Sequence, residues 1–181
     1  MDVERVSGER LCAVKIIGWP PENILSSLNT PECEAALKYA RKLVPRGNKE
    51  IYDYQAAALF HIARDHGQGP ILEIGTYYGY TAAIMALAAP TAQVITLNVL
   101  AWEVDAAQKR LAELRNVLCL LQNSRDYLHI YAGTPFSMIF VYGDHNRVKK
   151  DFPWWDKLAP GGLMLFHDYA PAGTRTTTTG P

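Results

Sequence analysis

From residue 70 onward, short apolar runs alternate with stretches whose apolar residues recur at helical spacing. Strands that are apolar at nearly every position are buried on both faces, and strands separated by helices pair in parallel. Right-handed crossovers place such helices on both faces of one sheet. The pattern therefore predicts a doubly wound α/β fold with a mainly parallel sheet. The runs cover residues 71–74, 93–97, 117–121, 137–141 and 162–166, with helical stretches at about 79–89, 102–115 and 147–158.

Two further helices are expected ahead of the first strand. Thr30 has the side chain of an N-cap and Pro31 suits the first helical position, which predicts a helix to about Leu43. Apolar residues at helical spacing predict a second helix from about Glu50 to Asp65.

The two ends of the chain carry less regular patterns. Trp19, Pro20 and Pro21 interrupt the first thirty residues, which we expect to be irregular. The Thr-rich end offers little that can be buried, and we expect it to be disordered. The predicted organisation is an irregular segment with one helix at 1–48, an α/β domain at 49–170 and a tail at 171–181.

Charge and cysteine content exclude several classes of function. The 181 residues include 18 Lys and Arg against 18 Asp and Glu, which argues against a nucleic-acid partner. The three cysteines are widely spaced and predict neither a disulfide framework nor a zinc knuckle. No apolar run is long enough to cross a bilayer, and the first residues lack the pattern of a signal peptide. We therefore predict a soluble, cytoplasmic protein with no membrane partner.

A glycine-containing turn follows the first buried strand. Gly75 and Gly79 permit positive φ, and the helix that follows offers free N–H groups to an anionic ligand. A dinucleotide site requires a third glycine two residues after Gly75, where Tyr77 stands, so a nicotinamide or flavin site is not favoured. The alternative is a turn that joins strand to helix without binding anything.

Three segments together resemble one known family. Residues 72–81 are similar to the E-x-G-x-x-x-G motif of class I S-adenosylmethionine-dependent methyltransferases. Residues 140–145 and 158–168 resemble the fourth and fifth strands of the small-molecule O-methyltransferases, whose fourth strand ends in D-G-D-H. The resemblance covers about residues 50–170 and implies a Rossmann-like methyltransferase fold with S-adenosyl-L-methionine as cofactor.

The resemblance also implies a set of site residues. Residues of the glycine turn would surround the methionine and ribose of the cofactor, Asn98 would face the ribose hydroxyls, and Asn123 to Arg125 would lie beside the adenine. His145, the last residue of the D-G-D-H-like segment, matches a general base, a role that suits a histidine. A histidine that only caps a loop or bonds to Asp144 is the alternative. The expected cofactor-binding residues are Glu73, Gly75, Thr76, Tyr77, Gly79, Tyr80, Thr81, Asn98, Asn123, Ser124, Arg125, Tyr142 and Asp144.

Three acids of the family pattern are replaced, by Asn98, Asn123 and Tyr142. Exchanging a charged acceptor for a neutral one costs on the order of 1 kcal/mol, so cofactor binding is weakened and not excluded. In the metal-dependent relatives, the position of Tyr142 supplies a carboxylate, and a phenol is a poor ligand for Mg²⁺. A divalent metal is therefore not favoured, with Asp168 the one plausible surviving ligand.

The family sheet has seven strands, and this sequence offers five. We therefore expect the last two strands to be missing, which an incomplete gene, a shortened chain or a degenerate member would explain. A second subunit, making a homo-oligomer, would cover the open edge. Trp154, Trp155 and Tyr169 would wall an aromatic acceptor pocket, although such residues more often belong to the core.

The leading hypothesis is methyl transfer to a hydroxyl of a small molecule. The alternative is a non-catalytic relative that keeps the fold as a binding or assembly module. A nucleic-acid or protein methyltransferase is less favoured, because the fourth strand is not followed by the D/N-P-P-Y/F tetrapeptide.

Overall fold

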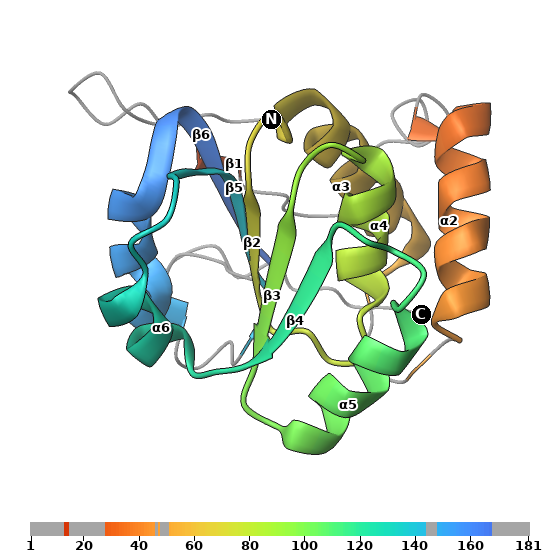
Figure 1. Cartoon of the computed structure of the whole chain (residues 1–181). Helices are drawn as coiled ribbons and strands as arrows, with labels where there is room; N and C mark the ends of the chain where they lie inside the picture. The colour runs from red at the N-terminus through yellow and green to blue at the C-terminus, as the bar shows by residue number, and fades with distance from the viewer. Residues whose placement is uncertain (1–12, 15–27, 46, 48–50, 144–147, 168–181) are drawn as a thin grey trace, which may run out of the picture.

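The computed structural model describes residues 13–14, 28–45, 47, 51–143 and 148–167. Within these residues the strands form one sheet in the order β1-β6-β5-β2-β3-β4, and every neighbouring pair is parallel. Helices cover both faces (Figure 1), so the predicted doubly wound α/β fold is confirmed. The strands are β1 (Ala13–Val14), β2 (Ile71–Ile74), β3 (Val94–Asn98), β4 (Val117–Leu121), β5 (Phe136–Val141) and β6 (Leu158–Phe166).

The helices divide between the two faces of the sheet. On one side α3, α4 and α5 lie against the strands, and α2 packs outside α3 and α4 (Figure 1). On the other side lie α6 and the 3₁₀ helix η1, which contact one another. The bounds are α2 (Pro31–Leu43), α3 (Asp53–His66), α4 (Tyr80–Ala88), α5 (Ala101–Arg110), α6 (Ser124–Ile130) and η1 (Val148–Lys157).

Each face of the sheet has its own hydrophobic core, because successive strand side chains point to opposite faces. Along β2, Ile71 joins the cluster under α3 and α4, whereas Leu72 and Ile74 join the cluster under α6 and η1. Trp154 of η1 is completely buried in the second cluster, and its Nε1 donates to the carbonyl of Ser124 at 3.2 Å. Of the three aromatic residues expected to wall an acceptor pocket or fill the core, Trp154 therefore belongs to the core.

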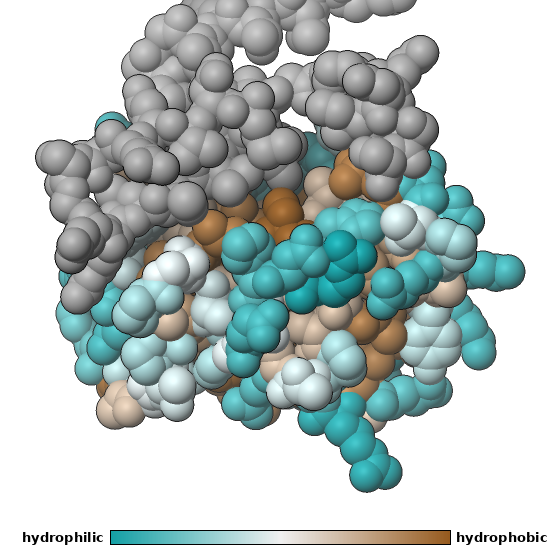
Figure 2. Space-filling model, turned by 90° about the horizontal axis from the view of Figure 1, so that it is seen from above, coloured by the Kyte–Doolittle hydropathy of each residue, from teal (hydrophilic) through white to brown (hydrophobic). Residues whose placement is uncertain are grey.

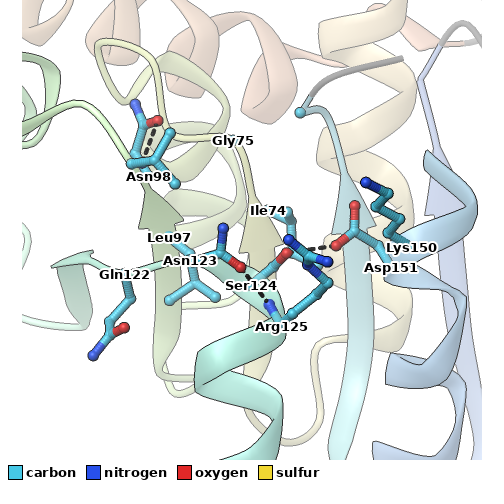
Figure 3. Close-up of a pocket in the computed structure, with 12 residues that line it drawn as sticks. Ile74, Gly75, Leu97, Asn98, Gln122, Asn123, Ser124, Arg125, Lys150 and Asp151 are labelled. Carbon is cyan, nitrogen blue, oxygen red and sulfur yellow. Dashed lines mark hydrogen bonds between the residues drawn. The ribbon is translucent and has the colours of Figure 1, made fainter. Parts of the chain in front are cut away.

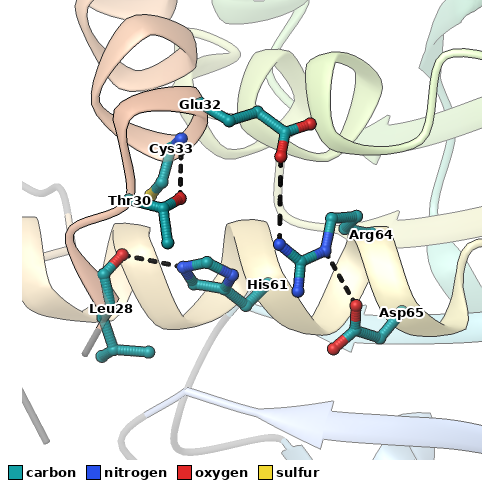
Figure 4. A network of polar contacts seen from close by, with 7 residues as sticks. All are labelled: Leu28, Thr30, Glu32, Cys33, His61, Arg64 and Asp65. Atoms are coloured by element: carbon teal, nitrogen blue, oxygen red, sulfur yellow. Dashed lines mark hydrogen bonds and ion pairs between the residues drawn. The ribbon is translucent and has the colours of Figure 1, made fainter.

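Helix α2 is joined to the rest of the described structure by polar contacts as well as by packing. Thr30 caps α2 by accepting from the backbone N–H of Cys33 at 3.2 Å, as the sequence predicts. The ring of His61 on α3 bonds to the carbonyl of Leu28 at 2.7 Å. Arg64 reaches Glu32 on α2 as well as its neighbour Asp65 (Figure 4). Residues of α2 also belong to the same hydrophobic cluster as those of α3 and α4. The predicted domain boundary near residue 48 stays a prediction.

Three sequence predictions about secondary structure were wrong. The first thirty residues are not all irregular, because Ala13–Val14 pair in parallel with Met164 and Leu165 on the edge of β6. The stretch expected as a helix at 147–158 is 3₁₀, with Pro153 inside it and unable to donate an α-helical hydrogen bond. Helix α5 ends at Arg110, not near 115, although Leu111 still packs into the core.

One short helix, α6, was not predicted, because its seven residues carry no clear apolar period. Seen from above relative to Figure 1, the described surface shows apolar patches between hydrophilic residues (Figure 2). None of the helices described by the structure has the length and apolar character needed to traverse a bilayer.

Candidate functional site

A cavity of about 230 Å³ opens at the carboxyl ends of the central strands. Strands β2 and β5 are neighbours, but the chain runs outward from β2 through β3 and β4, and in the other direction from β5 to β6. Crevices at such switch points are where ligands bind in open α/β sheets. The lining residues are Ile74, Gly75, Leu97, Asn98, Val99, Gln122, Asn123, Ser124, Arg125, Gly143, Lys150 and Asp151 (Figure 3).

The two glycines of the turn after β2 are required by the backbone itself. Gly75 has φ 107°, and a Cβ there would lie 2.7 Å from the backbone of Tyr142 at the end of β5. Gly79 has φ 90° as the N-cap of α4, and a Cβ there would lie 2.6 Å from the side chain of Leu111. The positive φ disfavours any other residue at both positions, and at Gly75 the backbone of Tyr142 also leaves no room for a side chain. Gly75 also lines the cavity, whereas the position of Gly79 is explained by helix packing.

Glu73 is a buried carboxyl beneath this turn. It is completely inaccessible, and it accepts hydrogen bonds from Thr81 on α4 and from Thr96 on β3, the latter at 2.6 Å. The Thr96 hydroxyl also contacts that of Thr76 at 2.5 Å. Burial raises the pKa of Glu73 to about 7, against the opposing effect of the two threonine hydroxyls. Glu73 therefore ties the turn to both β3 and α4, and it is not among the residues that line the cavity.

The tyrosines of the turn pack closely against one another. Tyr77 adopts φ 47°, a left-handed conformation that is uncommon outside glycine, and its ring lies 4.1 Å from that of Tyr78. A second hollow, lined by Ile51, Thr76, Tyr77, Tyr80, Thr81 and Tyr142, has a volume of only about 10 Å³. The described residues therefore leave open space on the Asn98 side of the turn and almost none on the tyrosine side.

Asn98, at the end of β3, lies at the edge of the cavity and is held by two hydrogen bonds. Its Oδ1 accepts from the backbone N–H of Val99 at 2.8 Å, and its Nδ2 donates to Oε2 of Glu103 at 2.5 Å. Glu103 belongs to the first turn of α5 and is only 8% exposed. The residue that replaces an expected acid is thus in direct contact with a buried carboxylate from another element.

A similar arrangement occurs at the start of α6. Asn123 caps this helix, its Oδ1 accepting from the backbone N–H of Arg125 at 3.0 Å. The hydroxyl of Ser124 donates to Asp151 of η1 at 2.6 Å (Figure 3). Burial raises the pKa of Asp151, while the Ser124 hydrogen bond and the charge of Arg125 oppose this rise. The predicted segment 123–125 and the acid Asp151 therefore form one wall of the cavity, together with Lys150.

The carboxyl ends of β5 and β6 bring two aromatic rings together. The rings of Tyr142 and His167 meet edge to face with 4.3 Å between their centroids, and the His167 Nε2 lies 3.2 Å from Oε1 of Gln55. The backbone N–H of His167 also donates to the carbonyl of Val141 at 3.0 Å. Within the described ranges, no group of three or more His, Cys, Asp or Glu side chains is placed to hold a metal ion.

Three predicted site residues, Asp144, His145 and Asp168, lie outside the residues that the structure describes. Of the others, the structure brings Gly75, Asn98 and the segment 123–125 to one cavity. The residues Thr76, Tyr77, Tyr80, Thr81 and Tyr142 line the small hollow instead.

Sequence reasoning missed the cavity residues Gln122, Lys150 and Asp151, and the buried Glu103 behind Asn98. No motif marks any of them. The one available signal was that Glu103 occupies the first turn of a predicted helix directly after β3, where a carboxylate is favoured by the free N–H groups.

Comparison with known proteins places the chain among methyltransferases. A family model described as a methyltransferase domain matches residues 72–169, more than half of the 181 residues. No curated protein sequence matches the chain.

Several solved structures are similar to it. The O-methyltransferase TomG of Streptomyces achromogenes, in complex with SAM, is 26% identical, with 79% of this chain and 69% of that chain covered and a TM-score of 0.61. The SAH-bound methyltransferase PaMTH1 of Podospora anserina is 19% identical, with 84% and 72% covered and a TM-score of 0.62. The O-methyltransferase of Bacillus cereus, in complex with SAH, is 23% identical, with 76% and 66% covered and a TM-score of 0.56.

The structures below 25% identity support the fold, and the family model supports the family. Together they confirm the predicted resemblance to methyltransferases. This chain belongs to the methyltransferase-domain family, within the class I S-adenosylmethionine-dependent methyltransferases.

Proposed function

We propose that this protein binds S-adenosylmethionine in the switch-point cavity and transfers its methyl group to a hydroxyl of a small molecule. The observation that carries the proposal is that the cavity is lined by Gly75, Asn98 and the segment 123–125. These come from three separate loops that the sequence resemblance assigns to the cofactor. Their convergence depends on the fold and not on the motifs themselves.

The chemistry of the lining suits the adenosine part of that cofactor. Ile74, Leu97 and Val99 provide apolar surface for a flat ring, and Asn98 offers both a donor and an acceptor for hydroxyl groups. Ser124 and Asp151 provide polar groups at the opposite side (Figure 3). The cavity volume is about 230 Å³. Pockets that hold drug-sized ligands have volumes of roughly 300–1,000 Å³. The cavity therefore suits the adenosine part of the cofactor better than the whole cofactor.

Gly143 supports a ligand in this position. It lines the cavity at the end of β5, and a Cβ there would have its nearest neighbour at 3.6 Å, an ordinary contact. Unlike Gly75, Gly143 is therefore not required by close packing of the backbone. A ligand that approaches the backbone closely requires a residue without a side chain, and this would explain a glycine that packing does not require.

For the chemical step we propose His145 as the general base, on the sequence resemblance alone, with Asp144 beside it. When bound, the cofactor supplies a methyl group on a positively charged sulfur, which is displaced in line by the acceptor oxygen. The chain then has two tasks, to hold the acceptor oxygen and to take its proton. A small hydroxylated molecule as acceptor is favoured by the O-methyltransferases among the similar structures and by the absence of net charge in the sequence.

The direct test is calorimetric titration with S-adenosylhomocysteine. We expect saturable binding by the unchanged chain and loss of binding in Gly143→Leu, whose side chain would occupy the cavity. Gly69→Leu is the matched control, because a Cβ there also meets nothing closer than 3.5 Å and the residue lies at the opposite end of β2. No heat and no thermal shift with millimolar ligand would contradict the cofactor assignment.

Binding and turnover are separate questions for this chain. Cofactor binding without methyl transfer to any of a broad panel of hydroxylated molecules would favour the non-catalytic alternative.

A further inference from the structure

The side-chain amide of Asn98 has a fixed orientation. Its oxygen accepts from the backbone N–H of Val99, and its nitrogen donates to the Glu103 carboxylate. If the amide were rotated by half a turn, oxygen would face oxygen at Glu103 and NH₂ would face N–H at Val99. Both hydrogen bonds would then be lost, so Val99 and Glu103 fix the orientation of the Asn98 amide.

Glu103 is placed to hold this contact firmly. Its carboxylate is in the first turn of α5, where the unpaired N–H groups of the helix favour a negative charge. It is only 8% exposed, and a buried carboxylate is costly unless hydrogen-bonded. The 2.5 Å contact with Asn98 provides such a hydrogen bond.

We propose that Glu103 is a positioning residue for ligand recognition, which acts through Asn98 on the ribose of the cofactor. Two hydrogen-bonding sites of the amide remain after its contacts with Val99 and Glu103: one N–H of Nδ2 and one lone pair of Oδ1. These match a pair of neighbouring hydroxyls, one accepting and one donating. The inference rests on the proposed function, because S-adenosylmethionine and its product carry that diol on their ribose.

The proposal leads to an unusual expectation for position 98. Restoring an acid there by Asn98→Asp would place two carboxylates in hydrogen-bond contact, and like charges at this distance repel. The acid should therefore weaken binding by at least tenfold while Glu103 is present. Exchanging the two groups, in Asn98→Asp combined with Glu103→Gln, restores one carboxylate and one amide and should bind within about threefold of the unchanged chain.

The experiment measures Kd for S-adenosylhomocysteine by calorimetry in the unchanged chain, E103A, E103Q, N98D and N98D/E103Q. We expect a loss of about tenfold in E103A and about threefold in E103Q, where a neutral acceptor remains. Asp105→Asn is the matched control, an exposed acid on the same helix, and should leave Kd unchanged.

A second measurement separates recognition from simple destabilisation. Adenosine and 2′,3′-dideoxyadenosine are compared by ligand-observed NMR, and the E103A loss should appear for adenosine alone, because only adenosine carries the diol. Equal losses for both nucleosides, or an N98D that binds as tightly as the unchanged chain, would overturn the proposal. Failure of the unchanged chain to bind S-adenosylhomocysteine would refute the cofactor assignment and this proposal with it, whereas unaltered binding in E103A would refute the proposal alone.

Discussion

Replacing Glu73 with glutamine should remove a large part of the pH dependence of this protein's stability. In the folded chain, burial raises the pKa of the Glu73 carboxyl to about 7, from an ordinary value of 4.5. Between these values the folded state holds a proton that the unfolded state has released. The free energy of unfolding therefore falls as pH rises through this window.

The size of the effect follows from the two pKa values of Glu73, folded and unfolded. A difference of one in pKa is equivalent to about 1.4 kcal/mol, so the Glu73 contribution is about 3 kcal/mol. It is fully present well below pH 4.5, falls as the pH rises from 4.5 to about 7, and is gone above that. Solvent does not screen this contribution, because the side chain is completely buried.

Glutamine can keep the local hydrogen bonds without the charge. Its oxygen can accept from Thr81, and its NH₂ can donate to Thr96, provided that the Thr96 hydroxyl then donates to Thr76. The hydroxyl pair of Thr76 and Thr96 permits this reversal, since either atom serves as donor. The variant should consequently fold with a stability within about 1–2 kcal/mol of the unchanged chain at pH 5.

Urea unfolding of both proteins at several pH values between 5 and 8 is the measurement. The unchanged chain should lose about 2.5 kcal/mol more than E73Q over this range, because part of the Glu73 contribution is already lost at pH 5. E73Q should therefore become the more stable protein at pH 8. Glu34→Gln on α2, where the side chain is exposed, is the control and should follow the unchanged chain. If the free energies of unfolding of the unchanged chain and E73Q change in parallel with pH, Glu73 is not protonated in the folded state at pH 5, and the reasoning is refuted.

Three further predictions concern catalysis, packing and metal. His145→Ala should lower turnover by roughly 10²–10⁴ and leave S-adenosylhomocysteine affinity nearly intact; equal turnover in steady-state assays would remove His145 from the mechanism. Trp154→Ala should cost about 3–5 kcal/mol of unfolding free energy, since it empties a fully buried site, and urea unfolding that shows less than 1 kcal/mol would contradict its place in the core. EDTA should change neither activity nor melting temperature, because the sequence resemblance aligns Tyr142 with a carboxylate of the metal-dependent relatives and a phenol is a poor ligand for Mg²⁺; a large drop in either would show that a metal is bound.

Much of the site was predictable because its motifs are local in sequence. The turn from Gly75 to Gly79 follows a buried strand and precedes a helix, and that order alone places it at the carboxyl edge of a parallel sheet. Asn98 ends the next strand and is brought to the same edge by the same rule. The cavity that contains Gly75 and Asn98 follows from strand order.

The contacts behind those motifs could not be predicted. Glu103 meets Asn98 because α5 turns back immediately after β3, and Asp151 meets Ser124 across 27 positions of sequence. From composition and spacing, both acids resemble ordinary solvated residues of a helix. In the sequence, asparagine at positions 98 and 123 in place of the expected acids indicates a loss of negative charge at the site. The structure instead places a carboxylate beside each segment, Glu103 of α5 beside Asn98 and Asp151 of η1 beside Ser124.

The sequence by itself determined the class of fold, the order of five strands along the chain, and the family. These depend on patterns that repeat over a few residues, namely apolar runs, helical spacing and glycine turns. Only the tertiary structure decided that Ala13–Val14 pair with the edge of β6, that Trp154 is core, and that Glu73 and Glu103 are buried in hydrogen bonds. Burial and pairing between distant segments depend on which surfaces meet in the folded chain. Short-range sequence patterns do not specify those contacts.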